Sequence, residues 1–215
     1  MSRAFVDVDV SDAANMRRTN TLRVEASYVS ARLTGSTARV VLNADPLSRI
    51  ALDAGDPDAM KRAIADAGAS QWIPTATLTR ADGSVESQQA LVACTAISRP
   101  GHRGPLGMLN LITMDLSQGV TPTDSDAVLA SGSTVMASPS RIYVALGHGS
   151  VARDRYVEAT DVHVFDTSSP NRTDYRASGS VEGSLLNQFS MSEYDDRLRI
   201  ATTLSSFAVS PLPAE

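Results

Sequence analysis

The sequence predicts an all-β fold made of repeated units of about fifty residues. A cassette occurs three times, each copy with an apolar strand that ends in an aspartate and with an apolar hairpin further along the chain. The three aspartates are Asp9, Asp115 and Asp166. Asp9 and Asp166 lie 157 positions apart (166 − 9), and the Val-Glu pairs at 24–25 and 181–182 share this offset, which argues against coincidence.

The three cassettes define the type of fold. They run from residues 6–12 to 39–42, from 111–117 to 142–145, and from 162–168 to 198–201. A repeated β unit of this size cannot bury both of its faces alone and stacks on its neighbours. We therefore expect a β-propeller whose blades are four-stranded antiparallel sheets.

The strands within the cassettes follow from apolar runs separated by turn residues. Residues 21–25, 28–33 and 38–42 predict a meander with a turn at Gly35. The same hairpin is predicted again for 134–137 with 142–146, across Pro139, and for 185–192 with 198–203. Glu193, Asp195 and Asp196 occupy the tip of the last hairpin.

A helix-containing insertion is expected at about residues 44–105, between two strands of one blade. Its helix is predicted over 57–67, because Asp56 is a favourable N-cap, Pro57 suits the first turn and Gly68 can end the helix. The segment Trp72-Ile73-Pro74 is expected to pack against apolar residues. Residues 75–80 and 85–93 predict a hairpin, and 99–105 a loop.

Length and composition favour one domain over residues 1–215 and exclude several classes. The 215 residues are 42% hydrophobic and 20% charged, which is ordinary for a globular protein. A net charge of −5 and scattered basic residues argue against nucleic-acid binding. No run approaches the about 20 apolar residues of a membrane span, and no export signal opens the chain. The single cysteine, Cys94, follows apolar residues and is predicted to be buried.

The repeated aspartates are interpreted as structural. A carboxylate at the end of a strand accepts N–H groups of the following turn. The alternative is that Asp9, Asp115 and Asp166 bind cations, but successive blades would hold them too far apart for one ion. Glu193, Asp195 and Asp196 are denser, yet lack the ligand spacing of a calcium loop, so a solvated turn is favoured.

No residue is predicted to be catalytic, to bind a cofactor or to bind a metal. His102, His148 and His163 are far apart and lack paired ligand spacing. The segment from Gly147 to Ser150 lacks the G-x-S-x-G pattern and the strand-to-helix context of a nucleophile elbow.

Several stretches resemble a known family. Residues 22–33 and 107–116, together with 186–194 and 198–203, are similar to the secreted β-propeller domains of bacteria and archaea that are distantly related to WD repeats. The resemblance covers nearly the whole chain. It implies an extracytoplasmic domain with no established enzymatic activity, although the family's members are usually longer and carry an export signal.

These observations favour a non-enzymatic propeller module for binding or assembly at the cell surface, with a protein or a surface polymer as ligand. One alternative is a propeller enzyme, a lyase or hydrolase with its site at the channel mouth, since fold does not fix function. Another is a gating propeller of a larger peptidase. An enzyme should bring His, Asp, Glu or Arg side chains together at one channel mouth.

The strand count predicts self-association. The chain begins with two outer strands, continues through two blades and ends with two inner strands. Each half blade exposes an unpaired strand edge, which is a liability in water. We therefore expect the inner half of one chain to complete the outer half of another, so that a symmetric dimer closes a six-bladed ring.

Overall fold

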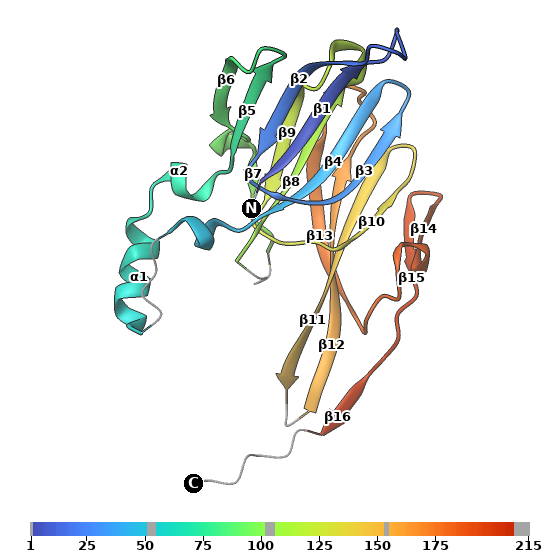
Figure 1. Ribbon diagram of the computed structural model, residues 1–215. Helices are drawn as coiled ribbons and strands as arrows, with labels where there is room; N and C mark the ends of the chain where they lie inside the picture. The colour runs from blue at the N-terminus through green and yellow to red at the C-terminus, as the bar shows by residue number, and fades with distance from the viewer. Residues whose placement is uncertain (1, 51–54, 102–105, 153–154, 209–215) are drawn as a thin grey trace. The chain divides into compact units, whose positions relative to one another are not determined.

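The protein is composed mainly of antiparallel strands (Figure 1). The computed structural model describes residues 2–50, 55–101, 106–152 and 155–208. Contacts divide the chain into two compact units, residues 1–131 with 169–173, and residues 132–168 with 174–215. Among the helices in the described ranges, none has the length and apolar character to cross a membrane.

Unit 1 contains two sheets. The first has the order β1-β2-β5-β6, and the second has the order β3-β4-β8-β9, with the short β7 parallel to β9. The strands are β1 (Arg3–Asp9), β2 (Arg17–Val24), β3 (Ser27–Thr34), β4 (Thr37–Ala44), β5 (Thr75–Arg80), β6 (Val85–Ala90), β7 (Ile97–Ser98), β8 (Met108–Asp115) and β9 (Pro122–Val128).

Unit 2 contains one four-stranded meander and one hairpin. The meander has the order β10-β11-β12-β13, and a short strand, β16, also pairs with β12. The hairpin consists of β14 and β15 alone. The strands are β10 (Thr134–Ala137), β11 (Arg141–Ala152), β12 (Arg155–Asp166), β13 (Asp174–Glu182), β14 (Met191–Tyr194), β15 (Arg197–Ile200) and β16 (Ser206–Ala208).

The internal repeat of the sequence is reproduced in the pairing of the strands. In the β1–β2 pair, Asp9 lies opposite Arg17, and in β12–β13 Asp166 lies opposite Asp174, both shifted by 157 positions. Both pairs, and β8–β9, contain a register shift just before the terminal aspartate. Strands β1, β8 and β12 are therefore equivalent in the repeat, and each pairs in the same way with the strand that follows the turn after its terminal aspartate.

The expected four-stranded sheets are confirmed as β3-β4-β8-β9 and β10-β11-β12-β13, with the pairs β1–β2 and β14–β15 outside them. The prediction of one meander over residues 21–42 is wrong, because β2 and β3 lie in different sheets. The reason is that β2 is already flanked by β1 and β5. Pairing with β5 continues to Glu25, whose N–H donates to the carbonyl of Thr75, before the chain turns into β3.

The segment between β4 and β8 contains a one-turn 3-10 helix η1 (Pro46–Arg49), α1 (Pro57–Asp66), α2 (Ala69–Trp72), β5, β6, a 3-10 helix η2 (Cys94–Ala96) and β7. The predicted helix is confirmed, and the Asp56 carboxylate accepts the N–H groups of Asp58 and Ala59. The prediction for Gly68 is wrong. Its φ of −75° is not left-handed, and it serves as the N-cap of α2, while α1 ends because Ala67 is extended.

The insertion joins the core of unit 1. Its β5–β6 hairpin adds to the edge of β2, an extension that the sequence did not predict. Leu22 and Val24 of β2 and Leu78 of β5 pack in one cluster with Val40 and Ile112 of the second sheet. Ile73 is buried in this cluster and Trp72 packs against it, which confirms the predicted docking of that segment. The two sheets of unit 1 therefore share one apolar core.

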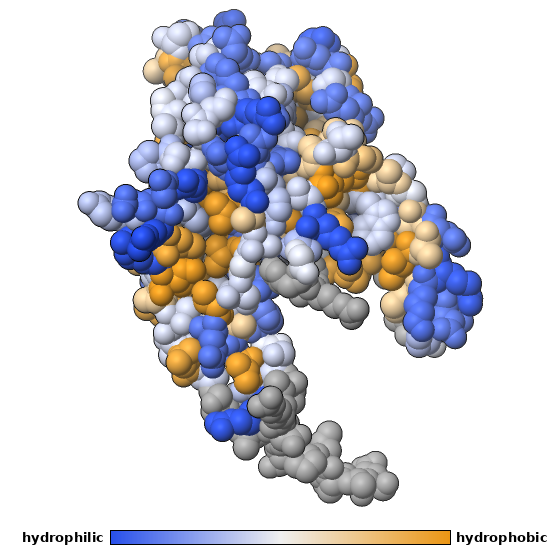
Figure 2. All heavy atoms as spheres, turned by 180° about the vertical axis from the view of Figure 1, so that it is seen from behind, coloured by the Kyte–Doolittle hydropathy of each residue, from blue (hydrophilic) through white to orange (hydrophobic). Residues whose placement is uncertain are grey.

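In unit 2 the hairpin β14–β15 packs on the meander. Tyr143, Ala145 and Val162 form a buried cluster with Met191, and Leu198 and Ile200 pack against it. The predicted strand over 185–192 is shorter than expected, because residues 188–190 form a 3-10 helix, η4, capped by the side chain of Asn187. Figure 2 shows hydrophobic side chains at the surface beside hydrophilic ones. Leu186 and Phe189 are among the most exposed of the large hydrophobic residues that the structure describes.

Candidate functional site

The three repeated aspartates each cap their own turn. The carboxylate of Asp9 accepts the N–H of Ser11 at 2.9 Å, and Asp115 accepts that of Ser117 at 3.0 Å. Asp166 accepts the N–H of Ser168 at 2.9 Å and the hydroxyl of the same serine at 2.6 Å. The predicted Asx-type turns are thereby confirmed at all three positions.

These hydrogen bonds stabilise the ionised carboxylates. The backbone N–H of Ser11 lowers the pKa of Asp9, and the Ser117 hydroxyl and N–H lower that of Asp115. The pKa of Asp166 falls to about 2, mainly through Ser168 and further through Arg176, which lies 3.1 Å away. Each carboxylate caps the turn that directly follows its own strand, and the carboxylate of Asp166 also pairs with Arg176 of β13.

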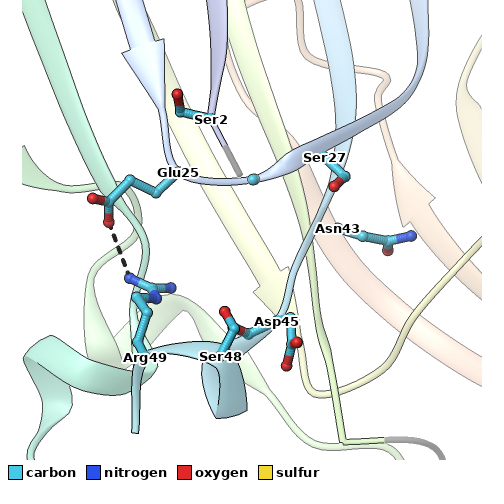
Figure 3. A pocket seen from close by; sticks show the side chains of 8 residues that line it. Ser2, Glu25, Ser27, Asn43, Asp45, Ser48 and Arg49 are labelled. Carbon is cyan, nitrogen blue, oxygen red and sulfur yellow. Dashed lines mark hydrogen bonds and ion pairs between the residues drawn. The ribbon is translucent and has the colours of Figure 1, made fainter. Parts of the chain in front are cut away.

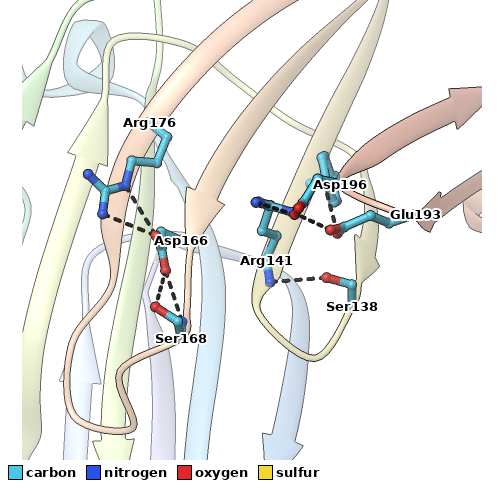
Figure 4. A network of polar contacts seen from close by, with 8 residues as sticks. Ser138, Arg141, Asp166, Ser168, Arg176, Glu193 and Asp196 are labelled. Carbon is cyan, nitrogen blue, oxygen red and sulfur yellow. Dashed lines mark hydrogen bonds and ion pairs between the residues drawn. The ribbon is translucent and has the colours of Figure 1, made fainter.

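The acidic tip of the last hairpin forms a network with β11 (Figure 4). Glu193 accepts hydrogen bonds from the guanidinium of Arg141 and, at 2.9 Å, from the hydroxyl of Tyr143. Arg141 also contacts Asp196 at 2.9 Å. Because the Glu193 side chain is only 9% exposed, the prediction of a solvated turn is wrong for this residue. It is right for Asp196, which is 84% exposed.

Packing explains the difference between the two acids. Glu193 lies in β14 opposite Leu198, on the part of the hairpin that packs against β11, whereas Asp195 and Asp196 form the turn itself. Both turn residues have positive φ, 53° and 54°, as a tight two-residue hairpin turn requires. Aspartate is among the residues that tolerate this conformation.

The network fixes the charge states of its members. Burial, together with the hydrogen bond to the Glu193 carboxylate, raises the pKa of Tyr143 to about 12. Burial opposes ionisation of Glu193, but hydrogen bonds from Ser138, Tyr143 and Arg141 outweigh it and hold the pKa below its usual value. The carboxylate is thus a charged acceptor that ties the last hairpin to the meander of unit 2.

A second polar network, absent from the sequence-based predictions, lies in unit 1. Arg39 of β4 is only 5% exposed and donates to the hydroxyl of Thr173 at 3.3 Å. Thr173 also shares a 2.8 Å hydrogen bond with Thr113 of β8, and its N–H donates to Asp124 at 2.7 Å. The residues that these contacts join are separated in the sequence by 49 to 134 positions, so no local pattern signals them.

The histidines do not converge. His148 lies 3.4 Å from the buried carboxylate of Asp161, and His163 is buried in β12 with its ring 6.2 Å from that of Tyr175. His102 falls outside the described residues. In the parts of the chain that the structure describes, no group of three His, Cys, Asp or Glu residues is placed to hold a metal ion.

The segment from Gly147 to Ser150 is part of a continuous strand. Its residues pair in register with β12, from Gly147 opposite Thr160 to Ser150 opposite Val157. The hydroxyl and ring of Tyr156 occupy the space where a Cβ on Gly149 would lie. A strand that runs straight through Ser150 does not present the sharp turn of a nucleophile elbow.

A polar pocket of about 590 Å³ opens in unit 1 near the end of β4 (Figure 3). Glu25 and Arg49 form an ion pair there at 3.3 Å, and Arg49 also donates to the carbonyl of Ile73. Asp45 caps η1 through the N–H of Leu47. The charged side chains that line the pocket therefore hold the segment between β4 and β8 in place. The residues lining it are Ser2, Glu25, Ala26, Ser27, Asn43, Asp45, Ser48 and Arg49.

Cys94 is exposed, so the prediction of a buried thiol is wrong. Leu91 and Val92 are buried, but the chain then turns outward into η2, which carries Cys94 to the surface. The residue borders an apolar pocket of about 430 Å³ with Trp72 and Met108. Among the residues that the structure describes, those lining this pocket include no cationic side chain, so the geometry does not indicate an activated thiol.

A comparison with protein-family models matches residues 3–212 to the beta propeller domain. The chain belongs to this family. None of the curated proteins compared with it matches.

Two strands of this chain have an edge that would be paired in a complete blade of a beta propeller. In both complete meanders the second and third strands are paired, as β4 with β8 and β11 with β12. By the repeat, β15 is a second strand and β1 is a third strand. Among the strands that the structure describes, β15 pairs only with β14 and β1 only with β2. Two strands that are interior in a complete blade are therefore open at one edge.

Proposed function

We propose that this propeller is a non-enzymatic module that binds or assembles through its open strand edges. The match to the beta propeller domain suggests an interaction or scaffold role. The observation that carries the proposal is that β1 and β15, interior strands by the repeat, each leave one edge unpaired within the described structure. An open edge is a template for another strand.

The proposal includes an extracytoplasmic location, on the basis of the resemblance to secreted propeller domains. Its ligands would be proteins or surface polymers, and self-association would use the same edges. The carboxylates of Asp9 and Asp166 are used in turn caps, and those of Glu25 and Glu193 in ion pairs, which supports a non-enzymatic role. A propeller enzyme or a peptidase gate would need a convergent set of acid, base or nucleophile at one mouth.

The assembly part of the proposal is tested with Ile200→Pro. The N–H of Ala201 donates to Ser190 across the β14–β15 hairpin, and bonding groups alternate along an antiparallel strand. The N–H of Ile200 therefore points to the open edge, and a proline removes it without removing a bond to β14. We expect light scattering to show association in the parent and in Ile200→Val, and loss of association in Ile200→Pro. A chain that stays monomeric at micromolar concentration contradicts the proposal.

The non-enzymatic part is tested with ester, peptide and phosphoester substrates. We expect no turnover by the purified chain. Turnover that is abolished by Ser150→Ala or His148→Ala contradicts this part of the proposal.

A further inference from the structure

We propose that the open edge of β1 is occupied by β15 of a second copy of this chain, in an antiparallel register that places Arg197 opposite Asp9 and Arg199 opposite Asp7. The inference rests on the proposed assembly function and specifies its partner. Each copy carries one β1 and one β15, so two copies form two equivalent junctions and satisfy both open edges.

The register follows from the complete sheets. The first residue of β4, Thr37, lies opposite Asp115, and the first residue of β11, Arg141, lies opposite Asp166. In both sheets the first residue of the second strand thus faces the aspartate that ends the third strand. Arg197 is the first residue of β15 and Asp9 ends β1, so the same rule pairs them.

The pairs that result are complementary in charge and in polarity. Arg197 and Arg199 meet Asp9 and Asp7 on one face of the ladder, because side chains of alternate residues share a face. Opposite charges that face each other across an antiparallel pair attract. On the other face Leu198 meets Val8, and Ile200 would lie opposite Val6. At the equivalent pair of unit 2, Arg141 and Asp166 also lie opposite each other, although there the two side chains contact Glu193 and Arg176 instead.

The hydrogen-bonding groups also fit. The N–H groups of Leu198 and Ile200 point away from β14, by the same alternation that directs Ala201 to Ser190. The charged pairs then occupy the non-hydrogen-bonded positions. At such positions the strands approach most closely, to about 4.5 Å between Cα atoms, so the side chains are in reach of each other.

The exposure of equivalent residues in the repeat shows that one face of β1 lacks a covering surface. Val6 and Val8 are 50% and 42% exposed, whereas their equivalents in β12, His163 and Phe165, are 2% and 0% exposed. The equivalents in β8, Ile112 and Met114, are also buried. The same two positions are therefore covered in both complete sheets and open in β1 alone.

A second copy supplies the missing cover. In unit 2 the face of the meander that carries Tyr143 and Val162 packs against the β14–β15 hairpin. If β1 and β2 of a second copy extend the β14–β15 hairpin into a four-stranded sheet, they lie over β12 and β13 of the same meander. Val164 of β12 belongs to the packing surface there. The exposed valines of β1 then gain an apolar neighbour, as their equivalents have in the complete sheets.

The test is a charge swap followed by sedimentation velocity. We expect Asp7→Arg and Arg199→Asp, each alone, to weaken self-association at least about tenfold, because each places like charges opposite one another at both junctions. The chain that carries both substitutions restores opposite charges and should associate within about threefold of the parent. Asp58→Arg, on the exposed surface of α1, is the matched control and should leave association unchanged. Circular dichroism checks that each variant is folded.

Disulfide trapping tests the register independently of charge. In a Cys94→Ser background, Asp7→Cys with Arg199→Cys should give a covalent dimer on oxidation, since non-hydrogen-bonded pairs have the spacing that a disulfide needs. Asp7→Cys with Leu198→Cys places the thiols on opposite faces and should not.

The outcomes separate the two proposals. A parent chain that never associates overturns both the assembly function and the β1–β15 junction. A parent chain that associates, with charge variants that associate equally well and with no disulfide in the matched pair, overturns the junction alone.

Discussion

Removing the Glu193 carboxylate should loosen the last hairpin of unit 2. Glu193→Ala leaves the hydroxyl of Tyr143, a residue only 3% exposed, without its acceptor. A buried donor that loses its partner costs about 1–3 kcal/mol. Arg141 is 31% exposed and keeps its contact with Asp196 at 2.9 Å, so the loss of its ion pair with Glu193 adds at most about 1 kcal/mol. The two contributions together give an expected destabilisation of about 1–4 kcal/mol.

The assay is urea unfolding at fixed protein concentration, combined with amide hydrogen exchange over β14 and β15. Glu193→Gln keeps the shape and one acceptor oxygen and should cost about 1 kcal/mol. Glu182→Ala, at an exposed residue of β13, is the control and should stay within about 0.5 kcal/mol of the parent. A Glu193→Ala variant that matches this control, with unchanged exchange in the hairpin, would refute the reasoning.

Three further predictions concern titration, a turn cap and the thiol. Spectrophotometric titration should show one of the five tyrosines ionising near pH 12, and Glu193→Gln should lower the pKa of that tyrosine; five ordinary transitions near pH 10 would contradict the buried pair. The pKa of Asp166 is lowered to about 2, so the carboxylate stabilises the fold above its ordinary pKa of 3.8 and this contribution is lost as the pH falls toward 2. Asp166→Ala should therefore cost about 1 kcal/mol at pH 7 and flatten this part of the curve of stability against pH. An unaltered curve would refute the cap. Cys94 should react with a thiol reagent in the native protein, and protection until unfolding would contradict its exposed position.

The sequence predicts the repeated part of the fold well because its signals are local. An apolar run that ends in an aspartate predicts β1, β8 and β12, and the hydrogen bonds of Asp9 and its two equivalents follow from the same few residues. The helix α1 is equally local, since Asp56 and Pro57 alone define its start.

The predictions that were wrong depend on contacts between distant residues. Cys94 follows an apolar run, but its exposure depends on where the chain turns after Val92. Glu193 lies at a hairpin tip and is buried because Arg141, 52 residues earlier, lies against it. The prediction of one meander over residues 21–42 was wrong for the same reason, since β2 pairs with β5, which belongs to the insertion. Hydrophobic pattern specifies the strands, but not which edge each strand selects.

We propose that two copies of this propeller chain associate through the edges of β1 and β15. Sedimentation velocity of the unmodified chain across the micromolar range tests it most directly. We predict a discrete species of twice the 22.7 kDa monomer mass that is lost on the Arg199→Asp substitution and recovered when Asp7→Arg is added. A single species of 22.7 kDa at all of these concentrations would contradict the claim.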